Sequence, residues 1–96
     1  GPPARLEVEI VGPPAAVRHG IRGIPGVVSV EELTVTNGAG RYVVESSRER
    51  DVRGEIFQVA AQQQWKLLEL RRVGTTLEEV FIRVVAGEQT AEEGGA

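Results

Sequence analysis

The sequence predicts a small α+β domain in which a four-stranded antiparallel sheet carries two helices on one face. Three observations predict this class. Apolar and polar residues alternate in segments typical of strands, and apolar residues three or four apart indicate two helices between them. The segments follow the order β-α-β-β-α-β, and two right-handed crossovers around a hairpin place four such strands in one sheet.

The first half of the chain is predicted to form a strand, a helix and a second strand. Residues 5–10 alternate charged and apolar side chains, which is typical of a half-buried strand. The Gly-Pro-Pro sequence at 12–14 ends that strand and starts a short helix, whose apolar residues recur at spacings of four and three. Gly and Pro at 23–26 end the helix, and β-branched residues over 27–36 form the second strand.

The apolar positions of this second strand change phase partway along it. Val28 and Val30 share one face under strict alternation, whereas Leu33 and Val35 fall on the other. A bulge inserts one extra residue into a strand, so the apolar residues that follow it return to the same face as those before it. We therefore expect a bulge near residues 31–32.

The second half of the chain continues with a hairpin, a helix and a fourth strand. The Asn-Gly-Ala-Gly sequence at 37–40 predicts the hairpin turn, because Asn and Gly accept positive φ at low cost. Residues 41–45 form the return strand. Asp51 is the candidate N-cap of a helix over 52–63, and 65–72 is the fourth strand. Together these elements predict a ferredoxin-like βαββαβ sandwich.

An extra helix is predicted after the fourth strand. Thr76 is its N-cap and Glu79 stands three residues on, as a capping box requires. The apolar stripe on this helix is too hydrophobic to remain in water, so we expect it to dock on the domain's own sheet or on a second copy. The candidate interaction residues are Trp65, Leu67, Leu77, Val80, Phe81 and Val84.

The chain divides into a domain and two short ends. Residues 1–3 are expected to be a linker or a scar of protease cleavage, and 4–86 the ferredoxin-like domain. Residues 87–96 are rich in Gly, Glu and Ala and are expected to be a disordered acidic tail. The tail holds three of the 14 acidic residues, which leaves 11 acidic against 11 basic residues in the body.

No residue is predicted to be catalytic or to bind a cofactor or metal. The chain has no Cys, which excludes disulfides and Cys-ligated metal sites, and it has no phosphate loop. A neutral body with four aromatic residues disfavours nucleic-acid binding, and Tyr42 is interpreted as a packing residue. The only histidine, His19, is expected to be exposed on its helix. No apolar run is long enough to insert into a membrane.

Five segments in a fixed order resemble a known family. They are Leu6-Glu7-Val8-Glu9, Ile24-Pro25-Gly26-Val27-Val28-Ser29-Val30-Glu31, Tyr42-Val43-Val44-Glu45, Trp65-Lys66-Leu67-Leu68-Glu69-Leu70 and Thr76-Leu77-Glu78-Glu79-Val80-Phe81-Ile82. Together they resemble the C-terminal accessory domain that follows the ATP-binding domain in prokaryotic ABC exporter subunits for drug, antibiotic, lipid or polysaccharide export. One departure is Gln64, where the family usually has Gly before the Trp, so the preceding helix is expected to end differently.

The resemblance implies a non-catalytic structural or regulatory domain, with no cofactor in this fragment. Its expected partners are the ATP-binding domain of the same parent chain, a second copy, and indirectly the transmembrane permease. The expected location is the cytoplasm, at the inner face of the cell membrane.

The alternative is a small-molecule sensor of the ACT type, which has the same fold. Such sensors bind metabolites where the loop after the first strand meets a neighbouring subunit. That loop is here the proline-rich 12–14, which is poor in hydrogen-bond donors. The sensor is therefore the second interpretation. A third is a domain that only stabilises the parent ATPase.

Overall fold

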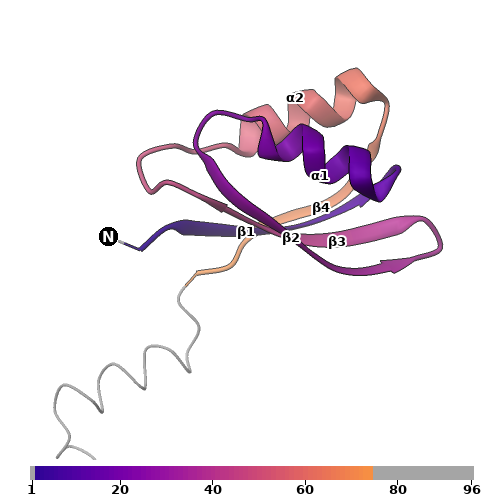
Figure 1. Ribbon diagram of the computed structural model, residues 1–96, viewed down its shortest axis with the longest axis horizontal. Coiled ribbons are helices and arrows are strands. Elements are labelled where there is room, and N and C mark those ends of the chain that lie inside the picture. The colour runs from indigo at the N-terminus through magenta and orange to yellow at the C-terminus, as the bar shows by residue number, and fades with distance from the viewer. Residues whose placement is uncertain (1, 75–96) are drawn as a thin grey trace, which may run out of the picture.

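Four strands and two helices follow one another in a computed structural model of the protein, which describes residues 2–74 (Figure 1). The elements are β1 Ala4–Val11, α1 Pro14–Arg22, β2 Val27–Thr36, β3 Ala39–Ser46, α2 Arg53–Gln63 and β4 Lys66–Arg72. The helix predicted from Thr76 onward and the tail predicted at 87–96 lie outside the described residues.

The four strands form one antiparallel sheet in the order β2-β3-β1-β4. Both helices lie on the same face of this sheet, and β2 and β4 form its edges (Figure 1). The two central strands alternate buried and partly exposed residues along their length, as strands with one covered face do. The predicted α+β class, with a four-stranded antiparallel sheet and two helices, is confirmed.

The core lies between the sheet and the two helices. Tyr42 in β3 is fully buried there, which confirms it as a packing residue, and burial raises the pKa of its hydroxyl. A Cβ on Gly40 would overlap the Tyr42 hydroxyl, so glycine is required two residues before the tyrosine. The core cluster contains Leu6, Val8, Ile10, Val17, Ile21, Ile24, Val30, Tyr42, Val44, Val52 and Ile56.

The bulge expected in β2 is present. The register against β3 shifts between Glu32 and Thr34, next to the predicted position, and shifts again between Val27 and Ser29. This second irregularity makes one prediction wrong. Val28 does not share the buried face with Val30, because the extra residue turns its side chain outward and leaves it 62% exposed.

Two other boundaries differ from the prediction. The fourth strand begins at Lys66, so Trp65 precedes it. The N-cap position of α2 is Val52, because helical geometry starts at Arg53. The Asp51 carboxylate, one residue before the N-cap, still accepts a hydrogen bond from the Arg53 backbone N–H, at 3.2 Å. It thereby satisfies one of the N–H groups that lack a partner at the start of the helix.

Residues of positive φ form the turn after β2 and the end of α2. Asn37 and Gly38, at φ 52° and 82°, form the predicted turn between β2 and β3. Gln64 adopts φ 63° and ends α2 in the left-handed conformation, with the Trp65 N–H bonded to the Ala60 carbonyl at 2.8 Å. The expectation that this helix ends differently without Gly is therefore wrong.

Candidate functional site

Trp65 is the candidate interaction residue that the structure describes most fully. Its indole packs against two glycines, one after β1 and one in α1. A Cβ on Gly12 would lie 2.6 Å from Trp65 Cδ1, and a Cβ on Gly20 would lie 3.0 Å from the far edge of the ring. The two glycines thus make room for the indole, which covers one end of the core and remains partly exposed.

Leu67 lies on the same side of the sheet as the core. It is opposite Ile10 in the register of β1 and β4 and is partly buried against the core cluster. Part of the surface of Trp65 and of Leu67 is therefore buried against the core of the domain itself. The other four candidate residues, Leu77, Val80, Phe81 and Val84, lie outside the described residues, so docking of their stripe remains a prediction.

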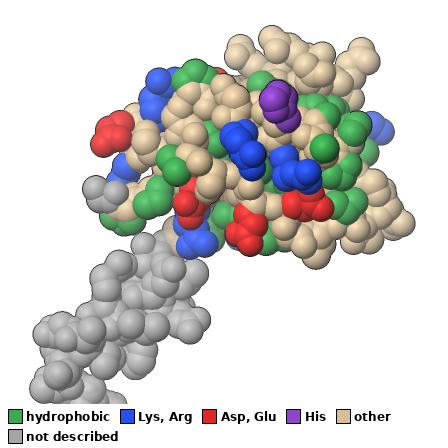
Figure 2. All heavy atoms as spheres, in the orientation of Figure 1, with side chains coloured by type: hydrophobic (Ala, Val, Ile, Leu, Met, Phe, Trp, Pro, Cys, Tyr) green, Lys and Arg blue, Asp and Glu red, His purple; other side chains and the backbone are tan. Residues whose placement is uncertain are grey.

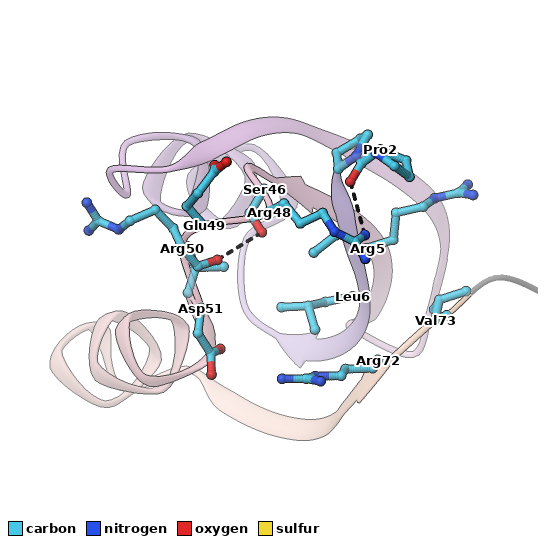
Figure 3. A pocket seen from close by; sticks show the side chains of 14 residues that line it. Pro2, Arg5, Leu6, Ser46, Arg48, Glu49, Arg50, Asp51, Arg72 and Val73 are labelled. Carbon is cyan, nitrogen blue, oxygen red and sulfur yellow. Dashed lines mark hydrogen bonds between the residues drawn. The ribbon is translucent and has the colours of Figure 1, made fainter.

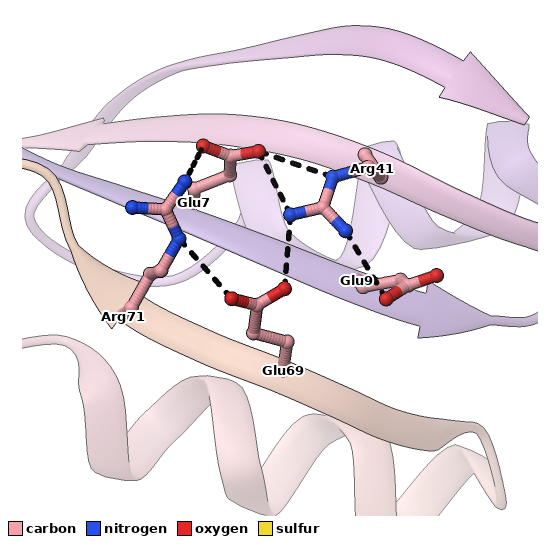
Figure 4. A network of polar contacts seen from close by, with 5 residues as sticks. All are labelled: Glu7, Glu9, Arg41, Glu69 and Arg71. Carbon is pink, nitrogen blue, oxygen red and sulfur yellow. Dashed lines mark hydrogen bonds and ion pairs between the residues drawn. The ribbon is translucent and has the colours of Figure 1, made fainter.

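The face of the sheet opposite the helices carries an ionic network that sequence reasoning missed. Its centre is Arg41 in β3, whose guanidinium donates hydrogen bonds to three carboxylates, two on the neighbouring strand β1 and one on β4 beyond it (Figure 4). The distances are 3.0 and 3.1 Å to Glu7, 3.1 Å to Glu9 and 2.9 Å to Glu69. Arg71 in β4 adds a second guanidinium, 2.7 Å from Glu7 and 3.1 Å from Glu69.

The strand register explains why these five residues meet. Glu9 is opposite both Arg41 in β3 and Glu69 in β4, and Glu7 is opposite Arg71. Cross-strand neighbours on one face lie within reach of long side chains. Charged residues at the polar positions of three alternating segments were the signal in the sequence, but it becomes specific only once the strand order is known.

The network is partly shielded from solvent. The Glu7 side chain is 15% exposed and that of Arg41 is 31% exposed. Hydrogen bonds from Arg41 to Glu69 and Glu7 raise the pKa of the Arg41 guanidinium, since they stabilise its charged form. Each carboxylate of the network is shared or held in place, so the face presents charges in a fixed pattern.

No group of three or more His, Cys, Asp or Glu residues within 2–74 could hold a metal ion. His19 is exposed, and Figure 2 shows the single histidine on the surface near basic side chains. No helix in this part of the chain is long and apolar enough to cross a membrane.

A pocket of about 550 Å³ opens at one end of the molecule (Figure 3). It lies where β1 begins and where β3 and β4 end, because β3 and β4 flank β1 and both run antiparallel to it. The segment that leads into α2 forms another wall. Sequence analysis did not single out this end of the domain.

Comparisons with known proteins do not identify this chain. No protein-family model matches it, and no curated protein matches it either.

Proposed function

We propose that this chain is a non-catalytic accessory domain of an ABC transporter ATP-binding protein. In this proposal it acts by packing against the ATP-binding domain of its parent chain or by association with a second copy. The proposed fold is the ferredoxin-like βαββαβ sandwich. The element order and the strand order β2-β3-β1-β4 support that fold, since it places both crossover helices on one face.

The observation that carries the proposal is the ionic face of the sheet. No element within residues 2–74 covers the face that bears Arg41, Glu7, Glu9, Glu69 and Arg71. A binding surface gains affinity when its side chains are already held in place before the partner arrives. Alternating charges also select a partner of complementary pattern. This face therefore suits protein docking better than it suits chemistry on a small substrate.

The proposal also assigns a location and indirect partners. The domain would reside in the cytoplasm at the inner face of the cell membrane, where the ATP-binding subunit meets its permease. No nucleic acid and no membrane insertion are part of this role. The resemblance in segments 6–9, 24–31, 42–45, 65–70 and 76–82 is its main support in the sequence.

The ACT-type sensor is the alternative, and the structure offers it less support. The loop after β1 would have to contact the metabolite. Gly12 in that loop is instead covered by the Trp65 indole, which leaves no space for even a methyl group. A ligand there would have to displace a packed tryptophan.

The test is binding of this chain to the ATP-binding domain encoded upstream of Gly1 in the parent gene. Walker and signature motifs in that upstream sequence are the first requirement. The two domains are then titrated in trans by NMR. We expect shifts on the ionic face and weaker binding of Arg41→Gln. Arg22→Gln, which removes one exposed Arg from α1, is the matched control and should bind normally.

Two results would contradict the proposal. One is the absence of the ATP-binding motifs upstream. The other is a chain that is monomeric in analytical ultracentrifugation and does not bind the upstream domain. If Arg22→Gln weakens binding as much as Arg41→Gln does, the ionic face is not the specific docking surface, and the helix side has to be considered instead.

A further inference from the structure

The pocket at the start of β1 combines an apolar floor with a basic rim. Leu6 and Val52 are almost completely buried beneath it, and Val73 is partly buried at its side. Four arginines line it against two acidic residues. The charged residues of the lining are Arg5, Arg48, Arg50, Arg72, Glu49 and Asp51.

The arginines do not contribute equally. Arg5 is 3.5 Å from the Glu45 carboxylate and Arg50 is 4.0 Å from that of Glu55, and Figure 3 shows both guanidinium groups directed away from the pocket. Arg48 and Arg72 instead extend on either side of Leu6 in this view. These two are the cations that a molecule in the pocket would meet.

Arg48 and Arg72 retain hydrogen-bonding capacity toward a ligand. One guanidinium nitrogen of Arg48 donates to the Pro2 carbonyl, at 3.3 Å, and the remaining N–H groups are available. Arg72 forms no ion pair with any residue in the range 2–74.

The nearest acidic group does not neutralise this pair. Asp51 lies on the side toward which Arg72 points (Figure 3). Its carboxylate, however, accepts three hydrogen bonds from Arg53, at 2.7, 2.9 and 3.2 Å. Asp51 is therefore paired with Arg53, although its carboxylate also interacts electrostatically with Arg72. With four arginines against two acidic residues, the lining still carries a net positive charge.

We propose that this pocket binds a small amphipathic anion, with its carboxylate or phosphate between Arg48 and Arg72 and its apolar body against Leu6, Val52 and Val73. Guanidinium groups bind both oxyanions through paired, charge-assisted hydrogen bonds. The volume of about 550 Å³ is within the range of small-molecule sites. This site is at the opposite end of β1 from the loop that an ACT-type sensor would use, and it does not depend on the transporter role.

The experiment is an NMR titration of the full chain with octanoate, octyl phosphate and neutral 1-octanol. We expect saturable shifts of the Leu6, Val52 and Val73 amides with at least one of the anions, and no saturation with octanol. Saturation by only one anion identifies the headgroup as carboxylate or phosphate. Binding should weaken at least about tenfold in Arg48→Gln and in Arg72→Gln, and less in Arg72→Lys, which retains the charge.

The control is Lys66→Gln, which removes one positive charge from the opposite end of β4. It should bind like the unmodified chain. Both arginines are exposed, so the variants should retain the spectrum of a folded domain. The proposal is overturned if neither anion saturates, if octanol binds as tightly, if the shifts map elsewhere, or if all four variants bind alike.

Discussion

At the residue scale, Trp65 shows how one side chain fixes the identity of two distant glycines. Gly12→Ala should destabilise the domain by about 1–3 kcal/mol, because its Cβ would lie 2.6 Å from Trp65 Cδ1 and the ring would have to shift. The matched control is Gly54→Ala in α2, where no atom lies within 4 Å of the added Cβ. That change should stabilise by about 0.5–1 kcal/mol. Urea denaturation measures both, and equal midpoints would contradict the packing role of Trp65.

Asp51 provides a second prediction at this scale. Hydrogen bonds from Arg53 hold the pKa of its carboxyl well below the ordinary value of 3.8. A lowered pKa in the folded state stabilises the fold above the ordinary pKa, and that contribution is lost as the pH falls below it. Asp51→Asn should therefore lower stability near neutral pH, and the difference should shrink below about pH 3. Urea unfolding at several pH values tests this.

At the element scale, periodicity predicted every strand and helix within residues 2–74 and one of the two irregularities of β2, but not the one between Val27 and Ser29. The alternation in β1 and the spacing of apolar residues in α1 reflect only which side chains are buried. That pattern can be read directly from the sequence. Val28 was misplaced because a bulge depends on the partner strand, and the sequence does not specify that partner. The ionic network on β1, β3 and β4 was missed for the same reason, since only the strand order brings Arg41 beside Glu69.

The end of α2 gives the prediction at this scale. Gln64 has φ 63°, a conformation that costs a residue with a Cβ about 1 kcal/mol. Gln64→Gly should therefore stabilise the domain by about that amount. The neighbouring change Gln63→Gly, at the last residue of α2, should instead destabilise it. Thermal unfolding of the two variants is the measurement. If the unfolding temperature shifts in the same direction in both variants, the left-handed conformation of Gln64 is not the cause of the effect.

At the scale of the whole molecule, the question is what the chain after β4 does. The described core is closed by side chains of 2–74, with Trp65 and Leu67 partly buried against it. We predict that Phe81→Ala acts in one of two ways. If its stripe docks on this domain's sheet, the change should lower stability by about 3–5 kcal/mol. If the stripe docks on a second copy, the change should convert a dimer to a monomer.

Analytical ultracentrifugation and urea denaturation separate these two outcomes. Glu88→Gln, which changes a charge in the acidic tail and no apolar residue of the stripe, is the control and should leave both readouts unchanged. Burial of a phenylalanine side chain contributes about 1.5–3 kcal/mol, so a docked Phe81 must register in at least one assay. A Phe81→Ala chain with unchanged stability and unchanged association would therefore reject docking of this segment, and would leave the ionic face as the only docking surface proposed for the domain.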